Sequence, residues 1–237
     1  MNIGGFEKYS FIDYPGLISS VIFTAGCNFH CPYCHNPELV GKGCGTLPAA
    51  SVSLDAIFSF LERRKKFVEG VVISGGEPTL QKGLAELCRE LQRMGLLVKL
   101  DTNGSLPGVL ADLLNRGLID YIAMDIKTDP DRYSPIISSD AVAANIHDSI
   151  NLVLSSGVPH EFRTTCVHPV VDLNAFRAIA RIVRGAFLYA LQVPRIGNGK
   201  DILDFSFFNR SGSVSGDAEL QGFRTVLSAS VESCIIR

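Results

Sequence analysis

The fold is decided by residues 17–34, which read LISSVIFTAGCNFHCPYC. The apolar, β-branched run over 17–24 is typical of a buried strand. Three cysteines follow it with the spacing C-x3-C-x2-C, at Cys27, Cys31 and Cys34. Thiolates at this spacing can converge on one iron–sulfur cluster or on one zinc ion.

The two metals make different demands on the rest of the sequence. Structural zinc takes four ligands, and the candidates for the fourth are Cys44, His30 and His35. An iron–sulfur cube can instead accept three cysteines and leave one iron open for a substrate. Structural zinc ligands often come as two separated pairs, whereas this triple is compact and no second pair follows it in the sequence. The pattern therefore favours the cluster.

The composition around this motif indicates a globular protein with a sizeable core. The chain has 237 residues, 46% of them hydrophobic and 19% charged, and 22 Lys and Arg against 24 Asp and Glu give a net charge of −2. The low charged fraction argues against intrinsic disorder, and the near-zero net charge argues against a nucleic-acid partner. Seven cysteines, an odd number in a chain of this length, indicate a reducing compartment.

The sequence offers no convincing membrane or export signal. No run approaches the ~18 consecutive apolar residues of a membrane span. Residues 24–27, TAGC, look superficially like a lipoprotein cleavage site, but the apolar run before them is short and contains two serines. We therefore expect a cytoplasmic protein with no membrane partner.

Apolar runs alternate with amphipathic segments along most of the chain. We expect strands over 17–24, 70–74, 96–101, 121–125, 161–166 and 187–193, and helices over 53–67, 80–94, 106–116, 141–155 and 172–184. Ser53 and Asp172 are suited to cap the first and last of these helices, and Gly95 to end the second.

Six strand–helix units are too few for a closed eight-stranded barrel. The sequence therefore predicts an α/β fold, a partial (β/α)6 barrel of parallel strands with helices outside and the cysteine loop after the first strand. We expect this barrel to cover residues 1–195. Residues 196–237 are expected to form a loop-rich extension packed on the same domain, ending in a short helix and a strand.

Three carboxylates repeat with the period of one strand–helix unit. Glu77, Asp101 and Asp125 lie 24 residues apart, and each falls at or just beyond the end of an expected strand. The carboxyl ends of parallel strands meet at one edge of a sheet, and ligands bind at that edge. We therefore expect the three side chains to face the same site.

Several motifs in a fixed order resemble known families. The C-x3-C-x-φ-C pattern with Tyr33 as the aromatic, together with the GGEP at 75–78, resembles the radical S-adenosylmethionine superfamily. The SFIDYPG at 10–16 and the CHNPE at 34–38 resemble, more closely, the glycyl-radical-enzyme activases. Among these, the activating proteins of anaerobic ribonucleoside-triphosphate reductase are the most similar. The likeness extends over about residues 4 to 195.

This resemblance implies the cofactors and the residues that hold them. Cys27, Cys31 and Cys34 would carry a [4Fe–4S] cluster whose open iron binds S-adenosylmethionine. No general base or nucleophile is implied, because the cofactors carry the radical chemistry. The residues implied to bind cofactor are Tyr33, His35, Asn36, Gly75, Gly76, Glu77, Asp101, Asn103, Asp125 and Lys127.

The resemblance also leaves choices open. The alternatives to cofactor binding are an ordinary turn for Asp101–Gly104 and a solvated ion pair for Asp125 with Lys127, but both motifs fall on the same edge, which favours binding. Some relatives place a histidine against the cofactor after the last barrel strand, where this chain offers Gln192 or Arg195 instead. Arg163 could contact an anion or serve as a structural partner. Cys44, Cys88, Cys166 and Cys234 are expected to be ordinary buried thiols.

The implied activity is an iron–sulfur activase. It would reductively cleave S-adenosylmethionine to a 5′-deoxyadenosyl radical and place a glycyl radical on anaerobic ribonucleoside-triphosphate reductase. Flavodoxin or ferredoxin would be the low-potential electron donor. The alternatives are activation of another glycyl-radical enzyme, such as pyruvate formate-lyase, radical chemistry on a small molecule, and a zinc-stabilised binding module without enzyme activity.

Overall fold

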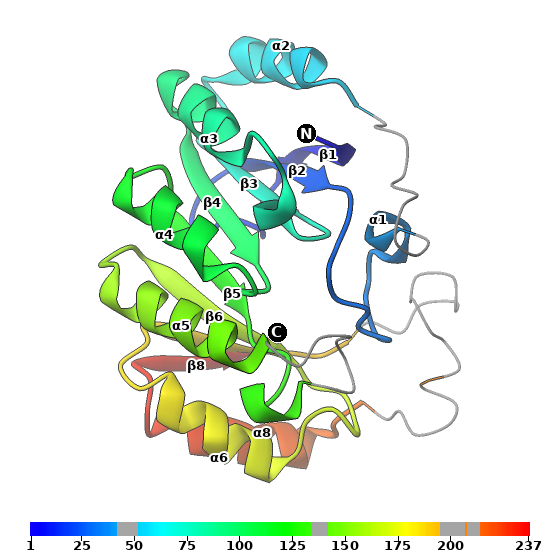
Figure 1. The fold of residues 1–237 in the computed structure, drawn as a ribbon, viewed down its shortest axis with the longest axis vertical. Coiled ribbons are helices and arrows are strands. Elements are labelled where there is room, and N and C mark those ends of the chain that lie inside the picture. Colours follow the sequence, from blue (N-terminus) through cyan, green and yellow to red (C-terminus); the bar gives the residue numbers. More distant parts are fainter. Residues whose placement is uncertain (42–51, 134–141, 195–206, 208–213) are drawn as a thin grey trace. The chain divides into compact units, whose positions relative to one another are not determined.

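The computed structural model describes residues 1–41, 52–133, 142–194, 207 and 214–237. The chain forms two compact units (Figure 1). The first comprises Met1–Asn28, Glu38–Thr102 and Gly108–Ile122, and the second comprises Phe29–Pro37, Asn103–Pro107 and Ala123–Arg237.

The first unit is built on a sheet whose strands follow the order of the chain. β1 (Ile3–Ser10) pairs antiparallel with β2 (Ser19–Thr24), which is followed by parallel β3 (Gly70–Gly75) and parallel β4 (Leu97–Thr102). Side chains alternate between the two faces of a strand. On one face, Val21, Val72 and Tyr121 form an apolar cluster with Tyr14. β5 (Tyr121–Asp125) begins in this unit and ends in the second.

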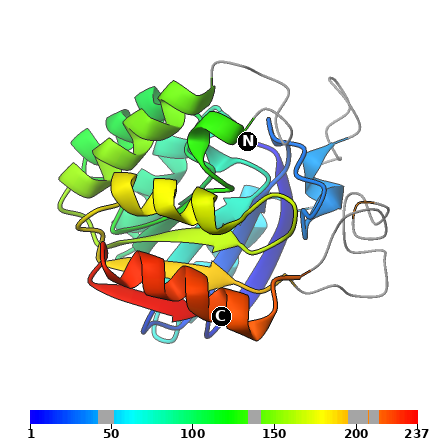
Figure 2. The same ribbon diagram turned by 90° about the horizontal axis from the view of Figure 1, so that it is seen from below.

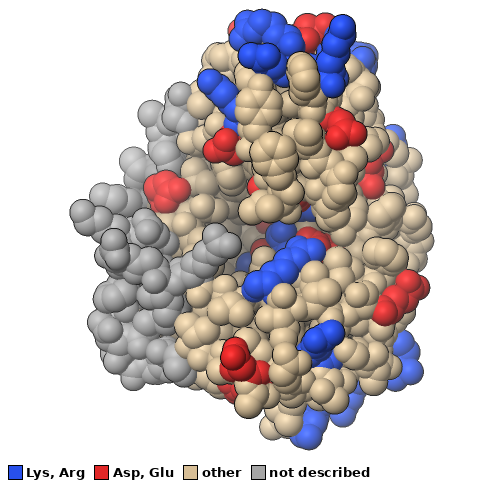
Figure 3. All heavy atoms as spheres, turned by 180° about the vertical axis from the view of Figure 1, so that it is seen from behind, with Lys and Arg blue, Asp and Glu red and all other residues tan. Residues whose placement is uncertain are grey.

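The helices of the first unit are placed by their apolar stripes and caps. They are α1 (Pro37–Val40), α2 (Leu54–Arg64), α3 (Leu84–Arg93) and α4 (Pro107–Asn115), with a short 3-10 turn, η1 (Pro78–Leu80), between β3 and α3. The Ser53 hydroxyl accepts a hydrogen bond from the Ala56 N–H at the start of α2, and Gly95 takes a φ of +80° just beyond α3. Both predicted signals are confirmed. Basic side chains gather over α2 (Figure 3), which carries arginines in its last turn.

The second unit contains three further strands, again in chain order. β6 (His160–Thr165), β7 (Leu188–Gln192) and β8 (Ser233–Ile236) are parallel. Around them lie α5 (Val142–Ser155), α6 (Leu173–Ile182), α8 (Asp217–Ser228) and the 3-10 turn η2 (Pro130–Arg132). The Asp172 side chain caps α6 as predicted. α6 and α8 lie side by side (Figure 2), with the rings of Phe176 and Phe223 4.3 Å apart.

The predicted elements agree with this structure to within a few residues at their ends. All six expected strands are present, and the expected terminal helix and strand are α8 and β8. The sequence reasoning missed β1. Two adjacent glycines, Gly4 and Gly5, interrupt its pattern, and register shifts interrupt its pairing with β2. Such a strand depends on its partner more than on propensity. No helix in the described ranges is long and apolar enough to cross a membrane.

Candidate functional site

In the first unit, three of the predicted motifs meet at one edge of the sheet. Thr24 at the end of β2 is in register with Gly75 at the end of β3, and β4 runs parallel beside them. Cys27 therefore follows β2 at the same edge where the GGEP turn follows β3. The Gly26 carbonyl accepts a hydrogen bond from the Glu77 N–H at 2.8 Å, which joins the cysteine loop to that turn.

The two glycines of the GGEP turn are required by the backbone of the chain itself. A Cβ on Gly75 would lie 2.4 Å from the Thr24 nitrogen, and one on Gly76 would lie 2.1 Å from the Gly26 oxygen. Gly75 also has a φ of +111°, a conformation that side chains disfavour. We expected these glycines to allow the close approach of a ligand. In the structure, the backbone of the chain at Thr24 and Gly26 already lies against them.

Glu77 is almost fully buried, and its contacts hold the turn together. Its Oε1 accepts hydrogen bonds from the Thr79 N–H at 3.1 Å, the Thr79 hydroxyl at 2.6 Å and the Thr102 hydroxyl at 2.7 Å. The last of these ties the turn after β3 to the end of β4. Sequence reasoning missed both threonines. The one local signal was a threonine two residues after a carboxylate, at a position where a side chain can cap a turn.

Asp101 lies near the end of β4 with two named partners. Its Oδ2 accepts a hydrogen bond from the Ser74 hydroxyl at 3.1 Å, and its Oδ1 forms an ion pair with the buried Lys99 ammonium. The sequence reasoning did not single out Lys99. A lysine in the middle of an apolar strand, two residues before a carboxylate and so on the same face, was the available signal.

In the second unit, Cys31 of the motif lies in the electrostatic range of Cys34, Asp125 and Lys127. Burial raises the pKa of the Cys31 thiol to about 11, although the nearby Lys127 ammonium acts in the opposite direction. The two motifs, more than 90 residues apart in the sequence, thus share a site within this unit.

Asp125 is held between two cations. Its Oδ1 accepts a hydrogen bond from the Arg163 Nε at 2.7 Å, and its Oδ2 accepts one from the Lys127 Nζ at 2.9 Å. Burial alone would raise the pKa of this carboxyl, but the two cations hold it well below its usual range. Burial likewise opposes the charge of Lys127, yet Asp125 and Cys31 raise its pKa. The pair is three-quarters or more buried rather than solvated, and Arg163 is its structural partner.

Two buried tyrosines lie in the same region, and they differ in whether the hydroxyl has a hydrogen-bond partner. The Tyr133 hydroxyl accepts a hydrogen bond from the Lys127 N–H at 2.8 Å, and its ring meets Phe29 edge to face. The Tyr33 hydroxyl, by contrast, is buried without a hydrogen-bond partner. Burial raises the pKa of Tyr33 well above its usual value, so the hydroxyl stays a donor. A buried donor of this kind is ready for a polar group that the protein itself does not supply.

The remaining predicted residues have less defined surroundings. Asn103 is buried, and its side-chain oxygen accepts a hydrogen bond from the Ser105 N–H at 2.9 Å, which forms an Asx turn. His35 is exposed and Asn36 partly exposed, just before α1. Gln192 ends β7, whereas Arg195 and Cys44 lie outside the described residues. Cys88, Cys166 and Cys234 are buried free thiols, as expected.

The three motif cysteines are chemically suited to an iron–sulfur cluster. Cys31 is buried, and Cys27 and Cys34 are partly exposed. Over the described residues, no three or more His, Cys, Asp or Glu side chains form a ready metal site. Cys27 belongs to the first unit and the other two to the second. Within the second unit, the soft donors Cys31 and Cys34 and the nearby buried hydroxyl of Tyr33 fit part of a cluster site with a polar ligand.

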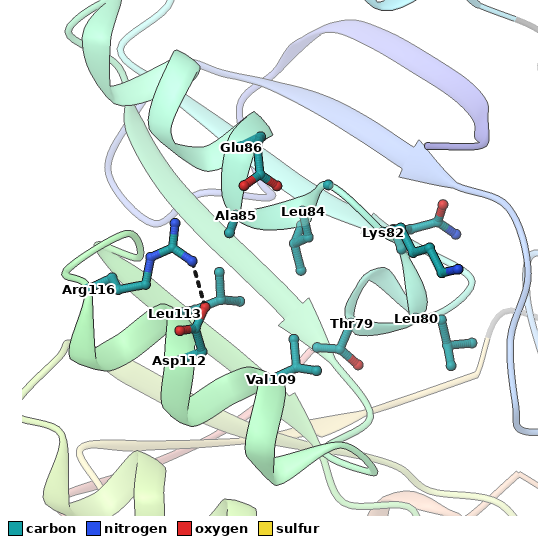
Figure 4. A pocket seen from close by; sticks show the side chains of 12 residues that line it. Thr79, Leu80, Lys82, Leu84, Ala85, Glu86, Val109, Asp112, Leu113 and Arg116 are labelled. Atoms are coloured by element: carbon teal, nitrogen blue, oxygen red, sulfur yellow. Dashed lines mark hydrogen bonds and ion pairs between the residues drawn. The ribbon is translucent and has the colours of Figure 1, made fainter.

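The first unit also has a cleft away from these residues, between η1, the start of α3 and α4 (Figure 4). Its volume is about 320 Å³. Leu84, Val109 and Leu113 give it an apolar lining, and an ion pair between Asp112 and Arg116 with a 2.7 Å contact lies at its side (Figure 4). None of the predicted cofactor-binding residues lines it.

Comparison with known proteins identifies the family of this chain. The model of the Radical SAM superfamily matches residues 21–183. A Methanocaldococcus jannaschii protein named as a glycyl-radical enzyme activating enzyme is 37% identical over 195 residues, which cover 80% of this chain and 78% of that protein. The pyruvate formate-lyase-activating enzyme of Clostridium pasteurianum is 29% identical over 188 residues, 77% of this chain and 76% of that enzyme.

A solved structure supports the fold. Streptococcus suis SuiB bound to its precursor peptide SuiA superposes with a TM-score of 0.66, covering 91% of this chain and 48% of that one at 12% identity. The chain therefore belongs to the radical SAM superfamily and, within it, to the glycyl-radical enzyme activating enzymes. It is an enzyme of this family, whose members use a [4Fe–4S] cluster and S-adenosylmethionine. The predicted fold class, an unclosed α/β barrel of mostly parallel strands, is confirmed.

Proposed function

We propose that this enzyme generates a glycyl radical on anaerobic ribonucleoside-triphosphate reductase. Membership of the family indicates the class of reaction. The observation that supports the site is the proximity of Cys31 to Cys34 and to the Asp125–Lys127 ion pair in the second unit. The sequence motifs at 4–40, which resemble the activating proteins of that reductase, support the choice of partner.

Cys27, Cys31 and Cys34 are proposed to hold the cluster. A cluster held by these thiolates would supply the electron for reductive cleavage of S-adenosylmethionine to methionine and a 5′-deoxyadenosyl radical, which would take a hydrogen atom from a backbone glycine of the partner. The protein's own task is to bind, orient and exclude water and oxygen.

The neighbouring residues have proposed roles that follow from their surroundings. Lys127, kept cationic by Asp125, is suited to the carboxylate of S-adenosylmethionine, and the Tyr33 ring and hydroxyl to its adenine. Asp125 would meet an ammonium or a ribose hydroxyl. Gly75, Gly76 and Glu77 shape the turn that would receive the amino end. Asp101, Asn103, His35 and Asn36 are proposed as further cofactor contacts.

The proposal extends to the setting of the enzyme. Free thiols in all the described cysteines suit a reducing, cytoplasmic compartment. A low-potential flavodoxin or ferredoxin would supply the electron. We also keep the division into a barrel over 1–195 and an extension over 196–237 as a proposal, supported by the pairing of β8 with β7.

The test is a radical assay with purified proteins. The chain is reconstituted anaerobically with iron and sulfide, reduced, and mixed with S-adenosylmethionine and the reductase. We expect a glycyl radical doublet by electron paramagnetic resonance and one 5′-deoxyadenosine per radical. The reductase with its radical-site glycine replaced by alanine is the control. Cleavage of S-adenosylmethionine with no doublet would reject this partner, and no cleavage at all would reject the activity.

A second candidate partner is pyruvate formate-lyase, because the Clostridium pasteurianum relative is named for that enzyme. The same assay with pyruvate formate-lyase in place of the reductase separates the two. A doublet on pyruvate formate-lyase alone would assign the chain to that partner. Iron and zinc analysis of the anaerobically purified protein checks the metal, and one zinc without iron would contradict both partners.

A further inference from the structure

β4 carries a lysine where the packing alone calls for an apolar side chain. Lys99 is 1% exposed. It is in register with Val72 on β3, and Val72 is in register with Val21 on β2. Both valines belong to the apolar cluster with Tyr14 and Tyr121. A residue with a cationic end in this layer needs a reason, because a buried charge is costly unless it is paired.

The ion-pair partner of Lys99 lies toward the edge of the sheet, beyond the apolar layer. Its ammonium forms an ion pair with Oδ1 of Asp101, and it lies 5.9 Å from the ring centroid of Tyr121. Asp101 is two residues further along the same face and so one layer closer to the edge that carries the GGEP turn. The lysine thus reaches from the core to a carboxylate at the proposed cofactor edge.

Asp101 is held from two sides. Lys99 contacts Oδ1, and the Ser74 hydroxyl donates to Oδ2 at 3.1 Å. Ser74 is itself fixed, because the Thr24 hydroxyl donates to its carbonyl at 3.1 Å. A carboxylate with a partner on each oxygen is restricted to one orientation. Such an arrangement serves a ligand that needs a fixed negative group.

We infer that Lys99 is a positioning residue for cofactor binding, acting through Asp101. Its ammonium holds the Asp101 carboxylate in the orientation in which it meets S-adenosylmethionine, and Lys99 itself does not touch the cofactor. This inference rests on the proposed function, which places Asp101 at the cofactor. It predicts that Lys99 matters for affinity only while Asp101 is present.

A double-mutant cycle measures that dependence. Lys99→Met, Asp101→Asn and the double variant are reconstituted with iron and sulfide, and S-adenosylmethionine binding is followed by calorimetry. We expect Lys99→Met to weaken binding at least tenfold at unchanged iron content, and the double variant to bind no worse than Asp101→Asn. Lys99→Arg, which keeps the charge, should recover most of the affinity.

Two further variants separate positioning from packing. Val72→Ala removes volume beside Lys99 and should lower the melting temperature while leaving the affinity within twofold of the wild type. Lys99→Gln repeats the cycle with a polar, uncharged side chain. Binding of Lys99→Met within twofold of the wild type, or additive effects in the cycle, would overturn the inference. Failure of both the Lys99→Met and the Lys99→Gln variants to fold would also overturn the inference.

Failure of this inference can be distinguished from failure of the proposed function. If the wild-type protein forms a glycyl radical and Lys99→Met binds S-adenosylmethionine normally, the inference fails and the function stands. If the wild-type protein does not bind S-adenosylmethionine at all, the proposed function fails with it.

Discussion

Replacement of Tyr33 by Phe tests whether a buried hydroxyl is reserved for the cofactor. Tyr33 and Tyr133 are buried to the same degree, at 3% and 2% exposure. Only the Tyr33 hydroxyl is without a hydrogen-bond partner. A buried polar group left unpaired costs about 1–3 kcal/mol. Tyr33→Phe removes that cost and keeps the ring, so it should stabilise the cluster-free protein by about that amount.

The expected shift can be measured by thermal unfolding. For a chain of this size, 1 kcal/mol corresponds to about 2–4 °C, so the melting temperature should rise by about 2–12 °C. In the reconstituted protein the same change should weaken S-adenosylmethionine binding. Loss of one net hydrogen bond of about 0.5–1.5 kcal/mol corresponds to an affinity lower by roughly 2- to 12-fold.

Tyr133→Phe is the matched control with the opposite sign. Its hydroxyl accepts the Lys127 N–H, so removal leaves that donor unpaired and should lower the free energy of unfolding by about 1–3 kcal/mol. The reasoning is refuted if Tyr33→Phe destabilises the cluster-free protein, or if it leaves the affinity for S-adenosylmethionine unchanged.

Three other perturbations follow from the site. Serine at any of the three motif cysteines should abolish bound iron and the visible absorbance of the cluster, whereas Cys88→Ser should retain both. Iron retained without a motif thiol would contradict the ligand assignment. Asp125→Asn leaves two buried cations without their carboxylate and should cost about 3–5 kcal/mol by urea unfolding. Because the folded pKa of Asp125 is lowered, its contribution is present above its unfolded pKa of about 4 and lost as the pH falls below it. The difference in free energy of unfolding between the wild type and Asp125→Asn should therefore become smaller in acid. A difference that stays constant with pH would exclude the ion pairs as its cause. Gly76→Ala places a Cβ 2.1 Å from the Gly26 oxygen and should destabilise the protein by about 1–3 kcal/mol, whereas Gly222→Ala, in open space within α8, should stabilise it by about 0.5–1 kcal/mol. Equal melting temperatures for the two alanine variants would count against the backbone contact.

The sequence alone determined the features that depend on local chemistry. Apolar runs alternating with amphipathic segments predicted six strands and five helices by their ranges, and a terminal helix and strand besides, so that β1 was the strand missed among the described residues. Hydrophobic periodicity directly records which face of an element is buried. The caps at Ser53 and Asp172 were predictable because a cap bonds to the backbone only three residues away. The cysteine spacing predicted the class of metal site for the same reason, because its ligands are neighbours in the chain.

The tertiary structure decided which partners those residues meet. Asp125 is shared between Lys127, two residues away, and Arg163, 38 residues away on β6, and only the pairing of strands brings the arginine there. Glu77 holds the turn through Thr102, and Asp101 is held by Lys99 and Ser74. These contacts depend on strand register, because a shift of one residue would turn each side chain to the other face. Residue types and spacing fix the chemistry that is available, and the pairing of strands decides which charges and hydroxyls are already used by the protein.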